Sequence, residues 1–153
     1  MPETSGKSLL LNQFFPYLMA NLAKRISDSC ATIYNDEFDL SIPEWRILAR
    51  LAENERQNSL ELAHLTFMDK SKVSRAVKQL DEKGLLQKEK HNEDNRVTYL
   101  SLNSQGKKLY HRIAPQALAW ESRLLEVLDV TEYRDLIRVI QKLDGQLDDF
   151  DAG

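Results

Sequence analysis

The chain has little cysteine, glycine and proline, and each shortage excludes a class of protein. A single cysteine, Cys30, excludes a disulfide within the chain, so we expect a reducing, cytoplasmic setting. Only 5 Gly and 4 Pro among 153 residues favour long helices over a loop-rich fold. No apolar run approaches the roughly 18 residues that span a bilayer, and the polar N-terminus MPETSGKS lacks the apolar region of a signal peptide. We therefore expect a helical protein without a membrane partner.

Motifs for catalysis and for metal binding are missing as well. The sequence contains no G-x-S-x-G, P-loop, glycine-rich dinucleotide turn or H-E-x-x-H. Its three histidines, His64, His91 and His111, fall in different segments, without the paired spacing of a zinc site. We therefore expect neither an enzyme nor a metal or other cofactor.

Charge is distributed unevenly along the chain. The formal net charge is −3, yet residues 70–96 contain eight Lys and Arg against five Asp and Glu. Residues 115–153, in contrast, contain nine acidic and four basic side chains. A basic segment inside an acidic protein is typical of a local nucleic-acid interface, because the total charge hides the patch.

Periodic apolar residues and capping patterns predict six helices. The first is expected over about residues 12–37, with its apolar residues in one stripe. Ser41 and Glu44 form a capping box that starts the second helix. The acidic ending DDFDAG is expected to be loose. N-caps of the other four helices are expected at Asn58, Asp69, Asn103 and Thr131.

Two short segments after the fourth helix have strand character. Residues 86–90 and 97–102 flank the polar cluster HNEDN, which predicts a β-hairpin with an exposed tip. Two short helices, a helix ending at Gly84 and a hairpin form the order of a winged helix-turn-helix. The predicted fold is therefore mainly α with a small β-hairpin wing.

The long helices at both ends carry more apolar surface than a small central domain can cover, which predicts a two-fold dimer. We therefore expect a flexible tail over 1–8, a winged DNA-binding domain over 38–103, and a dimerisation region formed by 9–37 and 104–149.

The stretch MDKSKVSRAVKQLDEKGLLQKE, residues 68–89, predicts a helix with two different faces. At about 100° per residue, Val77 and Leu80 fall within about 40° of Val73 and form the face that packs. Arg and Lys on the other face can donate to guanine or phosphate, and Ser can donate or accept at a base edge. The alternative is an ordinary solvated face. The residues predicted to enter the major groove are Ser71, Lys72, Ser74, Arg75 and Lys78.

The hairpin tip supplies a second candidate DNA contact. Arg96 on a protruding wing can enter a narrow minor groove, where negative potential is concentrated. Asp94, two residues earlier, can pair with an Arg and fix its direction. The alternative is a surface turn with a weak ion pair, which contributes roughly 0–1 kcal/mol.

The run KSKVSRAVKQLDEKGLLQKE, followed by EDNRVTYLSLNSQG, resembles the MarR family of bacterial winged-helix regulators. The segment IPEWRIL also resembles the second helix of that family. Two positions depart from the family pattern: Asn103 replaces the usual Thr, and Asp81 replaces the more frequent Glu. The matching positions are Ser71, Ser74, Arg75, Val77, Leu80, Gly84, Leu85, Asp94, Arg96, Leu102 and Gly106.

The resemblance implies a homodimer that binds a double-stranded, pseudo-palindromic operator in the bacterial nucleoid and usually represses transcription. Recognition helices would enter major grooves and wings would enter minor grooves. It also implies a small-molecule effector, often an aromatic or phenolic acid, that binds between the dimer region and the winged domain and releases DNA. We expect this pocket among the first, second and fifth helices, lined by Trp45, Arg46, His111 and Trp120.

Two alternatives remain open from the sequence. Peroxide-sensing relatives carry a cysteine near the start of the first helix, whereas Cys30 lies well inside it, where cysteine behaves as a small hydrophobe. Tyr34, Lys24 and Arg25 nearby keep redox sensing open. The other alternative is a winged-helix protein-interaction module, although such a module would tend to expose apolar residues on the fourth helix.

Overall fold

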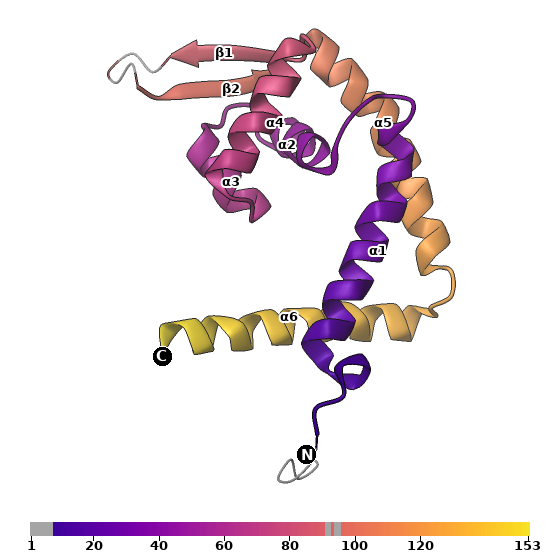
Figure 1. Cartoon of the computed structure of the whole chain (residues 1–153). Coiled ribbons are helices and arrows are strands. Elements are labelled where there is room, and N and C mark those ends of the chain that lie inside the picture. Colours follow the sequence, from indigo (N-terminus) through magenta and orange to yellow (C-terminus); the bar gives the residue numbers. More distant parts are fainter. Residues whose placement is uncertain (1–7, 91–92, 94–95) are drawn as a thin grey trace. The chain divides into compact units, whose positions relative to one another are not determined.

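The computed structural model describes residues 8–90, 93 and 96–153, and it has the fold class that the sequence predicts (Figure 1). No helix of this part of the chain is long and apolar enough to cross a membrane. The chain forms two compact units, an N-terminal unit that ends at Gln116 and a C-terminal unit over Ala117–Gly153. The elements are η1 (Leu11–Gln13), α1 (Phe15–Asn35), α2 (Ile42–Glu53), α3 (Ser59–Thr66), α4 (Lys70–Glu82), β1 (Leu86–Lys90), β2 (Thr98–Leu102), α5 (Ser104–Leu125) and α6 (Val130–Ala152).

Side-chain caps start four of the helices at the predicted residues. In each case a side-chain oxygen accepts a hydrogen bond from the backbone N–H three residues later, at 3.2 Å for Ser41, 2.8 Å for Asn58, 2.7 Å for Asp69 and 2.9 Å for Asn103. Glu44 completes the capping box of α2, because its carboxylate accepts from the backbone N–H of Ser41 at 3.2 Å. These local bonds satisfy N–H groups that the helix itself leaves unpaired.

Three expectations at helix ends are wrong. The N-cap of α6 is Asp129, which forms a capping box with Glu132, so Thr131 lies inside the helix. The acidic ending is helical to Ala152 and not loose. The first helix begins at Phe15, with Pro16 in its first turn, and the residues before it form the short η1. Proline is compatible with the first turn because its missing N–H has no partner there in any case.

The two strands pair antiparallel as a hairpin, in register from Leu86 opposite Leu102 to Lys90 opposite Thr98. A bridge that the sequence did not reveal joins this hairpin to the α2–α3 connection. The backbone N–H of Gln57 donates to the carbonyl of Leu100 at 3.0 Å, and the N–H of Leu100 donates back at 2.7 Å. The wing is therefore anchored, through the middle of β2, to the connection between α2 and α3.

One apolar core lies within the N-terminal unit. Helix α2 packs on α3 and α4, and the hairpin packs on α2, α3 and α4. Figure 1 shows the three helices grouped beside β1 and β2. The most deeply buried side chains of this core are Tyr34, Leu40, Ile47, Leu48, Leu51, Leu62, Val73, Leu80 and Ile113.

Helix α6 has a different character, because none of its residues is buried. Its apolar residues nevertheless recur at helical spacing, and the N-terminal half of α1 also exposes apolar side chains. The exposed apolar residues of α1 are Phe15, Leu18, Met19 and Leu22, and those of α6 are Val130, Tyr133, Leu136, Ile137, Val139, Ile140, Leu143, Leu147 and Phe150.

Candidate nucleic-acid interface

Helix α4 has the two faces that its sequence predicts. Its apolar side holds Val73, Ala76, Val77 and Leu80, all buried in the core of the N-terminal unit. This burial fixes which side of the helix faces solvent. The exposed side carries all five residues predicted to enter the major groove, namely Ser71, Lys72, Ser74, Arg75 and Lys78.

The cations on this exposed side are available to an external anion. Within the described part of the chain, Lys72, Arg75 and Lys78 have no ion-pair partner. Two nearby lysines differ, because Lys83 and Lys88 each contact a carboxylate, at 2.6 and 3.0 Å. A row of unpaired cations beside small hydroxyl side chains is suited to a DNA backbone and to base edges.

A shallow groove of about 220 Å³ runs between the exposed side of α4 and the start of α2. Lys72, Arg75 and Gln79 line it from α4, and Ser41 and Pro43 line it from α2. The sequence reading missed Gln79 and Ser41 as members of this surface. Gln79 lies four residues after Arg75, so helical spacing alone predicts that the two side chains lie on the same side of α4.

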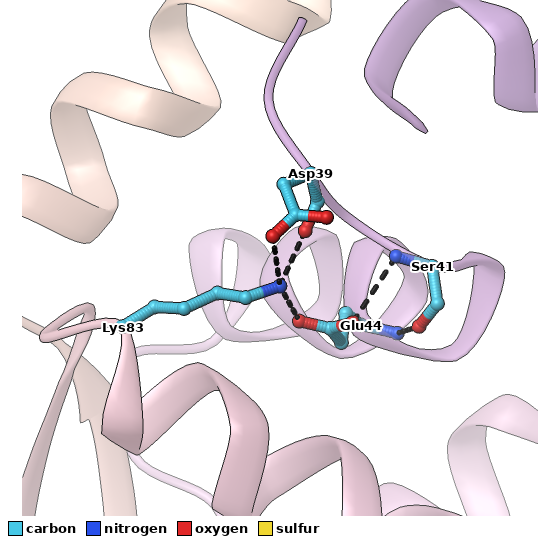
Figure 2. A network of polar contacts seen from close by, with 4 residues as sticks. All are labelled: Asp39, Ser41, Glu44 and Lys83. Carbon is cyan, nitrogen blue, oxygen red and sulfur yellow. Dashed lines mark hydrogen bonds and ion pairs between the residues drawn. The ribbon is translucent and has the colours of Figure 1, made fainter. Parts of the chain in front are cut away.

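A polar network ties the end of α4 to the start of α2 (Figure 2). The ammonium of Lys83 donates to Oε2 of Glu44 at 2.6 Å and also to the backbone carbonyl of Asp39. Oδ2 of Asp39 lies 3.9 Å from the same ammonium. Glu44 is only 3% exposed, and its other oxygen accepts the backbone N–H of Ser41. The sequence placed Lys83 in the basic segment but did not predict this contact.

The wing contributes one described candidate, Arg96, which is exposed just before β2. Asp94 lies outside the described residues, so its pairing with Arg96 stays a prediction. Toward the tip end of the two strands, the Arg56 guanidinium lies 4.3 Å from the centroid of the Tyr99 ring and 3.6 Å from a carboxylate oxygen of Glu89. These contacts join the α2–α3 connection to both strands, and sequence reading did not find them.

Aromatic rings from α1, α2 and α5 form a stack beside the interface. Trp45 stacks on Tyr34 and on Tyr110, with ring centroids 5.3 and 6.1 Å apart, and His111 meets Tyr110 edge-on at 5.5 Å. Two of these rings, Trp45 and His111, were predicted effector residues, whereas Tyr34 and Tyr110 were missed. Of the other predicted effector residues, Arg46 donates to the Ser27 hydroxyl at 3.4 Å, and Trp120 belongs to the C-terminal unit.

The Tyr34 hydroxyl in this stack has a raised pKa. Burial raises the pKa of its hydroxyl to about 12, and the nearby Cys30 adds to the rise. The hydroxyl therefore stays neutral at physiological pH. Cys30 is itself half-buried, four residues before Tyr34 on α1.

Two hollows in the N-terminal unit contain three of the four predicted effector residues, all except Trp120. One of about 490 Å³ lies between α2, the hairpin and α5, where Ala52, Gln87, Ser101, Tyr110 and His111 are among its lining residues. The other, of about 440 Å³, is lined by Trp45 and Arg46 together with Phe67. The first hollow thus involves the hairpin in place of the expected first helix.

Comparison with known proteins agrees with this geometry. A family model described as "Transcriptional regulator SarA/Rot" matches residues 30–113, which include α2, α3, α4 and the hairpin. The HTH-type transcriptional regulator FarR of Neisseria gonorrhoeae is 27% identical over 115 residues, covering 73% of this chain and 79% of FarR. A MarR/EmrR family transcriptional regulator of Acinetobacter sp. ADP1 is 27% identical with a TM-score of 0.82, covering 92% of this chain and 99% of that structure.

A third similar structure is that of BpsR from Bordetella bronchiseptica, described with the regulation of its DNA binding by 6-hydroxynicotinic acid. It has a TM-score of 0.80, covers 90% of this chain and 98% of BpsR, and at 16% identity it shows the fold alone. These relatives are transcription regulators and not enzymes, as the sequence predicted. The matched family and the MarR-type structures confirm the resemblance in the α4 and wing motifs: the chain belongs to the SarA/Rot family and is a DNA-binding transcriptional regulator of the MarR winged-helix type.

Proposed function

We propose that the protein is a homodimeric repressor that binds a pseudo-palindromic operator and is released from it by a small, aromatic effector. The observation that carries this proposal is the exposed side of α4, where three cations without an ion-pair partner among the described residues lie beside two serines. Such a surface matches the alternation of phosphates and base edges that a helix meets in a major groove.

The proposed contacts divide by chemistry. Ser71, Ser74 and Arg75 are close to the N-terminal end of α4, which is the end that reaches base edges in helix-turn-helix proteins. Lys72 and Lys78 are exposed and carry compact ammonium groups on flexible stems, which suit phosphate oxygens. Arg96, with Asp94 as its predicted partner, would enter the minor groove from the wing.

The proposal of a homodimer rests on apolar surface that the single chain leaves exposed. The exposed residues of α6 recur along one side of a 23-residue helix, and α1 exposes a second apolar row. Contiguous surface of this kind is typical of a protein interface. A second copy of the chain is the partner that also explains a palindromic operator, because a two-fold dimer presents two copies of α4. Helices from the predicted dimerisation segments, 9–37 and 104–149, would form this interface.

The proposed effector site is the hollow of about 490 Å³ that Tyr110 and His111 line. Its size is within the range of small-molecule pockets, and it combines aromatic walls with polar groups such as Gln87 and Ser101. A ligand there would touch α2, both strands and α5 at once. It would release DNA only if it binds better to an arrangement of these elements that does not fit the operator. The regulation of BpsR DNA binding by 6-hydroxynicotinic acid supports an aromatic acid as the kind of effector to test.

Arg75→Ala tests the DNA-binding assignment. If Arg75 pairs with a base in two hydrogen bonds, its loss should cost about 1–3 kcal/mol of operator affinity and relax specificity at one position. Fluorescence anisotropy on a duplex selected by the wild-type protein from a random pool measures this. Lys142→Ala on α6 is the matched control, because it removes one exposed cation outside the interface. Equal affinities for wild type and Arg75→Ala would refute the assignment.

A further inference from the structure

We infer that Lys83 and Glu44 are positioning residues for DNA recognition: their ion pair sets the place of α4 against α2 and so contributes to operator selectivity without touching a base. This inference rests on the proposed DNA interface of α4 and adds residues that lie outside it.

The geometry places Lys83 at a junction of three segments (Figure 2). Lys83 is the C-cap of α4, Glu44 is in the first turn of α2, and Asp39 lies in the connection between α1 and α2. The ammonium of Lys83 binds Glu44 at 2.6 Å and the carbonyl of Asp39 as well. Two of the three ammonium donors of Lys83 are thus directed at oxygens of two segments that lie 44 and 39 residues earlier in the chain.

Asp39 is held in an unusual backbone conformation at this junction. Its φ of +54° lies in the left-handed region, which residues other than glycine rarely adopt. The backbone N–H of the next residue, Leu40, donates to the carbonyl of Tyr34 at 3.1 Å. The carbonyl that receives Lys83 is therefore fixed to the end of α1 and is not a mobile loop group.

Apolar packing alone leaves the position of α4 underdetermined. Its buried side consists of Val73, Ala76, Val77 and Leu80, and contacts between such side chains are non-directional. Hydrogen bonds are directional, and in the described part of the chain the side chain of Lys83 makes such a bond between the end of α4 and the first turn of α2. The ion pair therefore supplies a fixed reference that the apolar contacts lack.

The buried position of Glu44 also argues for a role beyond stability. Taking the Glu44 carboxylate out of water offsets much of its attraction to Lys83, whose side chain is 30% exposed, so the ion pair is weak support for stability but can select one arrangement of helices. Here the selected arrangement matters for DNA, because Ser41 and Pro43 of the same α2 terminus line a groove with Lys72 and Arg75. A small shift of α4 along α2 would change the spacing of these groups against a phosphate.

The test compares selective with non-selective DNA binding in the full-length protein. The probes are the duplex selected by the wild-type protein from a random pool and a scrambled duplex of the same length and composition. Three variants are measured by anisotropy: Glu44→Gln, Lys83→Met, and the double variant, which removes both charges and leaves no unpaired buried charge. Far-UV circular dichroism and urea unfolding select a temperature at which each variant is folded.

Both single variants should lower the ratio of selected to scrambled affinity by roughly 3- to 30-fold, and the double variant by about as much as one alone. Glu44→Gln separates positioning from a direct contact, because a side chain that is only 5% exposed cannot reach DNA. Lys88→Met, which removes the lysine paired with Asp81 at 3.0 Å, is the matched control and should keep the ratio.

The inference would be overturned if Glu44→Gln and the double variant kept the wild-type ratio of selected to scrambled affinity and lowered only the unfolding midpoint. The ion pair would then contribute to stability alone. A loss in Lys83→Met that affects both duplexes equally, with Glu44→Gln at wild-type values, would also overturn it, because Lys83 would then contact phosphate directly. If the wild-type protein selects no duplex, the proposed function fails as well, and that result is distinct from either of the others.

Discussion

Helices α4 and α6 are both amphipathic, yet the chain uses their apolar sides differently. The 13 residues of α4 include four that are fully or nearly buried in the core of the N-terminal unit. The 23 residues of α6 include none. The helix-turn-helix thus completes its core within one chain, whereas α6 keeps an apolar side that only another surface can cover. In the proposed dimer, each helix-turn-helix folds within its own chain. The pairing of two such domains on two half-sites depends on the interface between chains.

Disrupting the apolar side of α6 should have the largest effect. Ile140→Glu places a charge in the middle of this side and should convert the proposed dimer to a monomer. Operator affinity should then fall by roughly 10²- to 10⁴-fold, because two linked half-site contacts become independent. Sedimentation velocity and anisotropy measure the two effects. Gln141→Glu, one residue later and exposed, adds the same charge on the polar side and should change neither.

Gly106 tests how closely the N-terminal unit is packed. A Cβ at this buried position in the first turn of α5 would collide with the backbone carbonyl of Leu85 and press on Leu102. Since a carbonyl of the core cannot rotate away like a flexible side chain, Gly106→Ala should lower the free energy of unfolding by about 1–3 kcal/mol. Urea denaturation measures the change. A wild-type midpoint would show that this contact is looser than described.

Phe67 is an exception within the well-packed unit. It is 93% exposed and has a φ of +55° at the turn between α3 and α4. Phe67→Asn should raise the free energy of unfolding by about 0.5–1 kcal/mol, because asparagine tolerates the left-handed conformation better and little packing is lost. Thermal unfolding gives the change. Operator affinity should be retained, and a clear loss would instead reveal that Phe67 contacts DNA.

Gly145 is the counterpart of Gly106 in the C-terminal unit. Its replacement by alanine should raise the free energy of unfolding slightly, whereas the same replacement at Gly106 should lower it. A Cβ at Gly145 meets no atom within 4 Å. Gly145→Ala should therefore stabilise α6 by about 0.5–1 kcal/mol through helix propensity alone. Destabilisation in the same urea experiment would show that a partner surface also covers the polar side of this helix.

Much of the fold could be predicted because its signals are local. Ser41, Asn58, Asp69 and Asn103 cap helices through bonds to residues three positions away. The same rule failed at α6 because Asp129 and Thr131 are both capping residues, and only Asp129 has a glutamate three positions later. The helical end at Ala152 was missed because acidic composition was read as disorder, although apolar residues continue at helical spacing to Phe150.

The candidate site divides in the same way. The exposed side of α4 follows from helical period, so its five predicted residues are all exposed. The contact of Lys83 with Glu44 and the stacking of Tyr34 and Tyr110 on Trp45 join segments far apart in sequence. No spacing rule connects such residues, because their proximity arises only when α1, α2, α4 and α5 pack.

The most direct test of the central claim is the salt dependence of DNA binding by a variant without the three cations of α4. The triple change Lys72→Ala, Arg75→Ala and Lys78→Ala is compared with Arg134→Ala, Arg138→Ala and Lys142→Ala on α6, which removes the same charge. If α4 is the DNA-recognition helix, the triple variant of α4 should lose at least roughly 100-fold in affinity for the selected duplex. The slope of its log affinity against log salt concentration should also be shallower by about 0.9 for each lost phosphate contact. The α6 variant should keep the wild-type slope. Equal affinities and equal slopes for the two variants would contradict the account.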